Sequence, residues 1–270
     1  MLPIALQVYS VREEAAKDPA GVLRKVGEMG YDGVELAGLY GLSPAEMKAT
    51  LDGAGLKAIS AHVDYNQMIA DPEKVLGGYA EIGCSWVAIP YLGDEYRIGA
   101  AKYDEVIAGV RKLGETAKSL GMTLLYHNHE FEFTLVGGEY ALDLLYKAVP
   151  ADLLQTQIDT CWAKVAGADP VQFILKYKGR APVVHFKDFY MEGDSLGGVS
   201  DPKLLEGIMP KRNKTFRFRH IGAGMQDIPA LVKASVDAGA KWIVVEQDMP
   251  TEGKTTMECA LESVKYLKSL

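Results

Sequence analysis

Histidine and acidic side chains close several of the short apolar segments of this chain. His127 and His129 follow one such segment, and Asp159, His185 and Glu246 stand at the ends of three later ones. In a barrel of parallel strands the carboxyl ends of the strands meet at one face, so these side chains would converge there. Imidazole and carboxylate groups are common ligands of divalent metal ions. The spacing therefore predicts a divalent-metal site at the mouth of a barrel.

Asp159, His185 and Glu246 would also be costly to bury in such apolar surroundings. An unpaired charge there would cost several kcal/mol, so each residue needs a metal ion or a hydrogen-bonded partner. A network of ion pairs would meet the same need. Since three ligand-type residues on successive strands would point at one small volume, we favour the metal ion.

The segment that follows the fifth apolar run leaves the fourth ligand open. His127 and His129 face the same side of their strand, because successive side chains alternate between its two faces. Both can reach the barrel mouth, and one of them is enough to complete a metal site. Glu132 is a further candidate if the strand persists that far, although Phe131 and Phe133 could instead close the loop.

Other candidate residues lie at or near further strand ends. His62 follows the third apolar run and His220 lies in a long later loop. A lone histidine in either place is more often a packed or surface residue than a functional one. Lys187 and Arg12 could hold hydroxyl, carboxylate or phosphate groups of a substrate, and exposed surface charge is an equally good interpretation of both.

The elements that must position these residues alternate regularly along the chain. Short apolar runs are separated by amphipathic helical patterns, which is typical of a parallel sheet covered by helices. Eight repeats without a break in composition predict an α/β fold, a (β/α)8 TIM barrel, as a single domain over residues 1–270. The predicted strands are Ile4–Val8, Gly33–Leu36, Leu56–His62, Trp86–Pro90, Met122–Tyr126, Leu154–Asp159, Pro182–Lys187 and Lys241–Gln247. The predicted helices include Pro19–Met29, Pro44–Gly53, Asp71–Ile82, Tyr103–Leu120, Tyr140–Lys147, Asp169–Lys176 and Pro229–Ala238.

Two regions depart from this alternation. Tyr190–His220 is richer in Gly, Lys and Arg and cannot be a single standard helix, so we expect an elaborated loop and a short helix near the active face. Ile221–Asp227 is a Gly-rich turn that opens a helix, and its backbone amides could hold an anion or a sugar hydroxyl. A plain turn before a helix explains the same residues equally well.

Bulk properties restrict the class of protein. A net charge of −7 and a pI near 5.3 argue against nucleic-acid binding, which needs a basic surface. The three isolated cysteines fit a reducing compartment, and the chain shows no signal peptide and no apolar run long enough for a membrane span. It lacks a P-loop and a complete dinucleotide fingerprint. We therefore expect a cytoplasmic enzyme without a nucleotide cofactor and with neither nucleic-acid nor membrane partners.

Five segments together resemble the sugar phosphate isomerase/epimerase family, whose members are xylose isomerase-like TIM barrels. The resemblance covers essentially the whole chain, and its motifs are specific to a superfamily rather than to one substrate. The segments are Leu6–Arg12, Tyr126–His129 with Glu132 and Phe133, Gln157–Trp162, Val184–Asp188 and Val244–Asp248.

The resemblance implies one divalent metal ion, often Mn²⁺, Mg²⁺, Zn²⁺ or Co²⁺, with one ligand from each of the last four barrel strands. Carried over to this chain, the three later ligands are Asp159, His185 and Glu246. Many relatives have a glutamate on the fifth strand, where this chain has His127. His127 is therefore the implied fourth ligand, Glu132 is the reserve, and assignment to the ketohexose 3-epimerases is weakened.

The resemblance also implies roles for residues around the metal ion. Related barrels that act on 3-keto-glycosides place a base two residues beyond the strand-five ligand, which here is His129. His129, Glu132 and Lys187 are the expected catalytic residues. Trp162 stands where epimerases tend to carry a substrate-binding histidine. The expected substrate-binding residues are Tyr9, Arg12, His62, Trp162 and His220.

These parts imply an isomerase or epimerase that acts on a sugar, keto-sugar or cyclic polyol through an enediolate. If the substrate carries a leaving group β to the carbanion, the same residues would make a lyase or dehydratase of an inosose or 3-keto-glycoside. A DNA-repair endonuclease of the same superfamily is disfavoured by the acidic charge and the small ligand set. A barrel that binds sugars without turnover is a further alternative. Barrels of this kind often pair, so a homo-oligomer is open.

Overall fold

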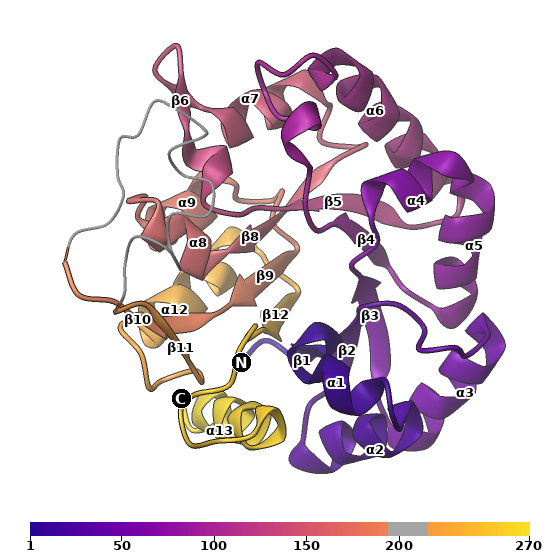
Figure 1. Cartoon of the computed structure of the whole chain (residues 1–270), viewed down its shortest axis with the longest axis vertical. Helices are drawn as coiled ribbons and strands as arrows, with labels where there is room; N and C mark the ends of the chain where they lie inside the picture. Colours follow the sequence, from indigo (N-terminus) through magenta and orange to yellow (C-terminus); the bar gives the residue numbers. More distant parts are fainter. Residues whose placement is uncertain (194–214) are drawn as a thin grey trace.

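Eight parallel strands form the centre of the molecule in a computed structural model, which describes residues 1–193 and 215–270. In Figure 1 the helices surround these strands. Hydrogen-bonded neighbours follow the order β3-β2-β1-β12-β9-β8-β5-β4, and all their pairings are parallel. The strands are β1 (Ile4–Gln7), β2 (Gly33–Leu36), β3 (Lys57–Ala61), β4 (Trp86–Ile89), β5 (Thr123–His127), β8 (Gln155–Asp159), β9 (Val183–Phe186) and β12 (Trp242–Val245).

The seam between β3 and β4 nearly closes this sheet into a barrel. His62 forms an isolated parallel bridge with Ala88, and the Val63 N–H donates to the Ala88 carbonyl at 3.0 Å. Below it, the Ser85 N–H donates to the Ile59 carbonyl, also at 3.0 Å. The predicted TIM barrel is confirmed, and each of the eight predicted strands is present within two residues of its expected ends.

Helices cover the outside of the barrel. Several of them begin at capping side chains, as at Ser43, which accepts the Glu46 N–H while Glu46 accepts from the Ser43 backbone. None of the described helices has both the length and the apolar character needed to cross a bilayer. The α-helices are α1 (Arg12–Ala15), α2 (Pro19–Met29), α3 (Pro44–Ala54), α4 (Tyr65–Ala70), α5 (Pro72–Ile82), α6 (Tyr103–Ser119), α7 (Ala141–Ala148), α8 (Thr160–Val165), α9 (Pro170–Lys176), α12 (Ile228–Ala238) and α13 (Thr256–Lys268).

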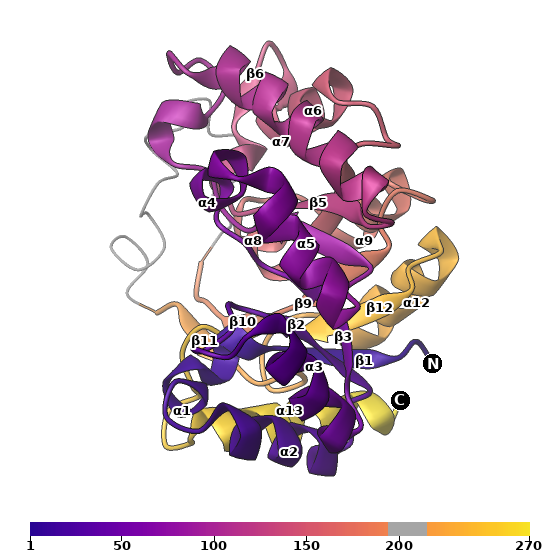
Figure 2. The ribbon, with the colours of Figure 1, turned by 90° about the vertical axis from the view of Figure 1, so that its right-hand side faces the viewer.

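The last helix, α13, is absent from the helices predicted from the sequence. It follows β12 and packs beside α2, so helices from the two ends of the chain are neighbours (Figure 2). The remaining short elements lie in loops. They are the 3-10 turns η1 (Val8–Val11), η2 (Asp94–Tyr96) and η3 (Phe131–Phe133), and the hairpin of β6 (Leu135–Val136) with β7 (Glu139–Tyr140).

Apolar side chains fill one layer of the barrel interior. Leu125, Val183 and Val244 belong to a small buried cluster that is separate from the large core between strands and helices. Because side chains alternate along a strand, the next inward residues are polar. The apolar layer thus supports a polar layer above it, at the carboxyl ends of the strands. The polar layer contains Gln7, Glu35, His127, Gln157, Asp159, His185 and Glu246.

An antiparallel ribbon follows β9. Its strands are β10 (Asp188–Tyr190) and β11 (Arg217–Arg219), so the expected elaborated loop is present, whereas the short helix expected within Tyr190–His220 would fall in 194–214, outside the described residues. The Asp188 carboxylate accepts the N–H groups of Gly222, Gly224 and Gln226 at 3.0, 3.0 and 3.1 Å. The amides of the Gly-rich turn that could have held an anion therefore have a partner within the protein.

Candidate active site

The four predicted metal ligands lie together at the carboxyl ends of the strands. His127 ends β5, Asp159 ends β8, His185 lies in β9 and Glu246 follows β12. Each offers one nitrogen or oxygen atom, and all four atoms lie within 4.8 Å of one another. All four side chains are buried.

The ligand atoms of this group are close neighbours. His127 Nε2 lies 3.7 Å from Asp159 Oδ2 and 3.9 Å from Glu246 Oε2, and His185 Nδ1 lies 2.9 Å from the same Glu246 oxygen. Asp159 Oδ1 accepts the N–H groups of Cys161 and Trp162 and so begins α8. Its second oxygen, Oδ2, is buried, accepts no hydrogen bond from the described residues, and lies 3.2 Å from the Lys187 ammonium nitrogen. A donor set of two imidazoles and two carboxylates fits Zn²⁺, Mn²⁺, Co²⁺ or Mg²⁺.

Lys187 brings a buried positive charge to the edge of this group. Its ammonium nitrogen lies 3.2 Å from Asp159 Oδ2, 3.2 Å from Glu246 Oε2 and 3.3 Å from Asp248 Oδ1. Burial alone would lower the pKa of Lys187, but these carboxylates raise it well above its ordinary value. Lys187 is therefore charged and compensates part of the negative charge around it.

The electrostatics of His185 depend on two carboxylates. Burial alone would lower its pKa, but Glu35 and Glu246 on opposite sides of the ring raise it to about 10. The pKa of Glu246 is in turn held well below its ordinary value by Lys187 and His185, despite burial. In the metal-free protein a protonated His185 and Lys187 together balance the acidic groups.

Two buried polar residues that were not predicted from the sequence lie beneath the ligands. Glu35 of β2 and Gln157 of β8 are both fully buried. Glu35 lies between Val34 and Leu36, so the reasoning applied to Asp159, a charge in an apolar run, would have selected it too. For Gln157, an uncharged amide, that signal was weaker.

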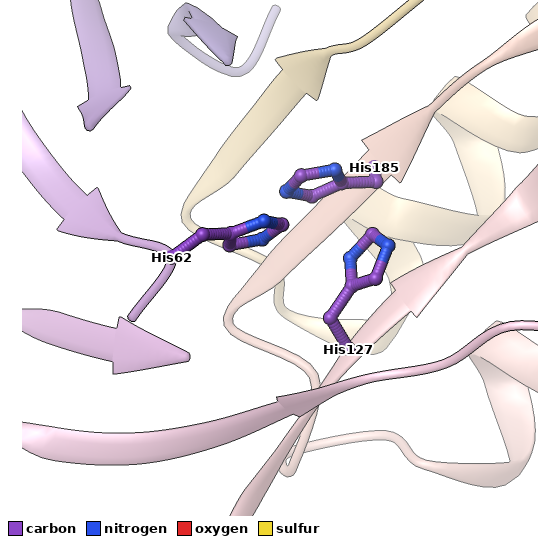
Figure 3. Close-up of side chains that lie close together, drawn as sticks. All are labelled: His62, His127 and His185. Carbon is purple, nitrogen blue, oxygen red and sulfur yellow. The ribbon is translucent and has the colours of Figure 1, made fainter. Parts of the chain in front are cut away.

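His62, an expected substrate-binding residue, is one of three imidazoles that converge from different strand ends (Figure 3). One nitrogen of each of His62, His127 and His185 lies within 4.8 Å of the others. His62 Nε2 is 2.9 Å from Glu35 Oε1 and 2.6 Å from Gln157 Oε1, so this nitrogen already has protein partners. His62 does not belong to the group of four residues with Asp159 and Glu246.

His129, an expected base, lies in an aromatic wall beside the ligand group. Its ring stacks on Trp162 at a centroid distance of 5.7 Å and meets the His127 ring edge-on at 5.4 Å. Burial, with the nearby charge of Lys187, lowers the pKa of His129 to about 3, so its imidazole is neutral. His129 Nδ1 and Trp162 Nε1 are buried atoms without a hydrogen-bond partner among the described residues. A polar substrate could supply those partners.

Glu132, the other expected base and the reserve ligand, lies outside the four-ligand group. The strand ends at His127 and the chain turns through η3, so the strand persistence on which Glu132 depended is absent. Its carboxyl group accepts the Tyr126 hydroxyl and, at 2.6 Å, the His129 N–H. Burial raises the pKa of Glu132 to about 8. Glu132 thus supports the backbone of His129.

The remaining expected substrate contacts lie in two different places. Arg12 packs over the ring of Tyr9 at 4.2 Å and donates to the Asp248 carbonyl at 3.0 Å, and Tyr9 is exposed. His220 instead contacts the chain around α13. Its ring nitrogens lie 3.2 Å from Thr251 Oγ1 and 3.1 Å from Glu262 Oε2.

Comparisons with known proteins place this geometry among similar barrels. The model of the family described as xylose isomerase-like TIM barrel matches residues 23–270. An inosose dehydratase from Lacticaseibacillus casei is 24% identical over 259 residues, which cover 88% of this chain and 85% of the relative. A sugar phosphate isomerase/epimerase from Parabacteroides distasonis superposes with a TM-score of 0.78 at 23% identity, over 100% of this chain and 99% of the other. A xylose isomerase-like TIM barrel protein from Mycobacterium smegmatis in complex with magnesium gives 0.70 at 16% identity, over 100% and 96%.

Proposed function

Because the chain belongs to the xylose isomerase-like TIM barrel family, we propose that it is a divalent-metal-dependent isomerase or epimerase of a sugar, keto-sugar or cyclic polyol. The observation that carries the proposal is the group of His127, Asp159, His185 and Glu246, whose ligand atoms lie within 4.8 Å of one another. These four residues would hold one ion. The magnesium complex of the M. smegmatis protein supports a divalent cation.

The ion, when bound, would act as a Lewis acid that polarises a carbonyl oxygen of the substrate and so acidifies the neighbouring C–H group. The residues around it would then move the proton. His129 is neutral and carries a buried Nδ1 without a partner among the described residues, so it is the proposed base for the proton α to the carbonyl. The strongly lowered pKa of His129 makes it a weak base in the empty site, and bound substrate must supply contacts that favour its protonated form.

Lys187 is the proposed electrostatic stabiliser of the deprotonated substrate. Its ammonium group is buried between Asp159, Glu246 and Asp248, where a positive charge acts more strongly than in water. Trp162, Tyr9 and Arg12 are proposed to line the substrate site. Return of the proton to the adjacent carbon gives isomerisation, and return to the opposite face gives epimerisation.

A second candidate function is a dehydratase that uses the same residues. The inosose dehydratase of L. casei, which matches most of this chain, supports it. In that reaction the deprotonated substrate expels its β-hydroxyl group, which takes up the proton held by the base and leaves as water, so that this proton does not return to carbon. The two reactions share the metal site and the base, and they diverge only after the proton has been lost.

The test is incubation of the Mn²⁺-loaded protein in deuterated water with keto-sugars and with an inosose, followed by mass spectrometry. Incorporation of solvent deuterium without loss of water supports the isomerase or epimerase, and loss of one water molecule supports the dehydratase. Absence of both reactions with every substrate, together with less than about a tenth of an equivalent of bound metal after loading, would contradict the proposed function.

Three further expectations stay predictions. They are a cytoplasmic location, a homo-oligomeric state and a single domain over residues 1–270. Mn²⁺ in particular, rather than Zn²⁺, Co²⁺ or Mg²⁺, is likewise a prediction, because the donor set fits all four ions.

A further inference from the structure

Glu35 is a buried carboxylate beneath the metal ligands, and nitrogen or hydroxyl groups lie close to both of its oxygens. Its Oε1 lies 2.7 Å from His185 Nε2, 2.9 Å from His62 Nε2 and 2.7 Å from Gln7 Nε2. Its Oε2 accepts the Ser60 hydroxyl and, at 2.6 Å, Gln157 Nε2. A buried carboxylate surrounded in this way can only accept, so every facing group must present a hydrogen.

The orientation of the Gln157 side-chain amide follows from this requirement. The two ends of an amide differ only in whether they donate or accept, and the end next to Glu35 must be the NH₂ group. The opposite end, Gln157 Oε1, therefore faces the histidines. It lies 3.1 Å from His127 Nδ1 and 2.6 Å from His62 Nε2.

An oxygen at that position decides the tautomer of His127. Since Gln157 Oε1 can only accept, the hydrogen of a neutral His127 ring must lie on Nδ1. The lone pair is then on Nε2, and Nε2 is the nitrogen that faces Asp159 Oδ2 and Glu246 Oε2. Glu35 thus acts on His127 through Gln157.

Glu35 acts on His185 directly. His185 Nε2 lies 2.7 Å from Glu35 Oε1, and a lone pair so close to a carboxylate oxygen would be repelled, so the hydrogen belongs on that nitrogen. Nδ1 is left to carry the lone pair once the ring is neutral, and Nδ1 lies 2.9 Å from Glu246 Oε2, inside the ligand group. Carboxylates and carbonyls that bind the second nitrogen of a histidine ligand commonly fix its tautomer in this way.

We propose that Glu35 is a positioning residue that sets the ligating nitrogen of both His127 and His185, the first through Gln157 and the second by direct contact. The proposal deepens the proposed function, since it rests on a metal ion at the four-ligand group. Glu35 itself does not belong to that group.

The first test is the affinity of purified protein for Mn²⁺, measured by calorimetry. Glu35→Gln keeps the size of the side chain but adds an NH₂ group that needs an acceptor, so Gln157 can turn over and present its own NH₂ group to His127. We expect Mn²⁺ binding to weaken by about 10- to 100-fold. Asp143→Asn is the matched control, because it neutralises a buried carboxylate of α7 that contacts Lys176 and Tyr177 instead of the site. The control should bind Mn²⁺ as the wild type does.

The second test reads the histidine tautomers by ¹⁵N NMR of histidine-labelled protein. In the wild type His127 should carry its hydrogen on Nδ1 without metal, and His185 on Nε2 once Zn²⁺ is bound. Glu35→Gln should change the tautomer at His127. Wild-type His127 with its hydrogen on Nε2 would overturn the proposal. Weaker Mn²⁺ binding in Glu35→Gln without a change of tautomer at either ring would also overturn it.

Gln157→Leu keeps the proposal testable if Glu35→Gln does not fold. It removes the amide between Glu35 and His127 but leaves Glu35 next to His185, so His127 should lose its preferred tautomer and His185 should keep its own. If the wild type binds no divalent ion, the proposed function fails. The tautomer of His127 in the metal-free protein still decides the role of Glu35.

Discussion

Single atoms of single residues define the proposed chemistry. Asp159 uses one carboxylate oxygen to begin α8 and leaves the other facing the ligand group. His129 and Glu132 lie three residues apart, yet burial moves the pKa of the imidazole down to about 3 and that of the carboxyl group up to about 8. Both groups are therefore neutral near pH 7, although only His129 lies beside the ligand group.

The two oxygens of Asp159 can be separated by mutation. Asp159→Asn retains an oxygen for the Cys161 and Trp162 amides but turns an NH₂ group toward the metal ligands, so we expect Mn²⁺ binding to be lost with little change in folding. Calorimetry and circular dichroism measure the two effects. Asp169→Asn is the matched control, since Asp169 caps α9 in the same way outside the ligand group. Mn²⁺ binding by Asp159→Asn at wild-type affinity would contradict the assignment.

Substitution of Lys187 should affect turnover and metal binding in opposite directions. Lys187→Met removes a positive charge next to Asp159 and Glu246, so Mn²⁺ should bind at least as tightly as in the wild type. If Lys187 stabilises the deprotonated substrate, kcat should fall by about 100-fold or more. Steady-state kinetics and calorimetry test this, with the exposed Lys48→Met as control. If the variant lost both Mn²⁺ binding and activity, Lys187 would instead be needed to form the metal site.

Glu132 should make the stability of the protein depend on pH. Burial raises its folded-state pKa to about 8, whereas in the unfolded chain it titrates near its ordinary value of 4.5. Between these values unfolding releases a proton, so the contribution of Glu132 to stability falls as pH rises from about 5 to about 8. Glu132→Gln cannot titrate and resembles the protonated form. We expect its free energy of unfolding to gain about 4 kcal/mol relative to the wild type across this range, measured by urea unfolding. Parallel pH profiles of the two proteins would contradict it.

At the scale of elements, the alternation of side chains along each strand places the site. Leu125, Val183 and Val244 form the apolar layer, and the ligands His127, His185 and Glu246 lie two residues further along the same strands. A shift of one residue in any strand would exchange its inward and outward side chains. The register of each strand therefore decides whether its ligand faces the barrel interior. Close packing of the helices against the strands holds that register.

Two helix glycines test that packing. A Cβ atom at Gly114 of α6 would clash with the backbone carbonyl of Leu153, just before β8, whereas a Cβ at Gly77 of α5 meets no described atom within 4 Å. Gly114→Ala should destabilise the protein by about 1–3 kcal/mol, and Gly77→Ala should stabilise it by about 0.5–1 kcal/mol. Urea unfolding measures both. Equal effects of the two substitutions would show that α6 does not approach β8 so closely.

At the scale of the whole molecule, the metal ligands connect distant parts of the chain. β5, β8, β9 and β12 are consecutive in the sheet and separated in sequence, and one ion would join their carboxyl ends. A ligand that binds only the folded state stabilises the entire cooperative unit.

Mn²⁺ should therefore raise the melting temperature of the barrel. At a free Mn²⁺ concentration of about 100 times the Kd, binding adds about 2.7 kcal/mol to the free energy of unfolding. For a protein of this size that corresponds to a rise in melting temperature of roughly 5 °C. Thermal unfolding followed by circular dichroism with Mn²⁺ and with EDTA measures it, and Asp159→Asn is the control without a shift. An equal shift in that variant would place the ion elsewhere.

The strands, most of the helices, the barrel and the grouping of His127, Asp159, His185 and Glu246 could be predicted from the amino-acid sequence. Periodicity marks strands and helices locally, and parallel strands must bring their carboxyl ends together. Tertiary structure decided the rest, because it depends on partners distant in sequence. Glu35 meets Gln157 and His185 only in the closed barrel. The turn through η3 directs Glu132 toward Tyr126 and away from the ligands, and strand periodicity does not encode such a turn.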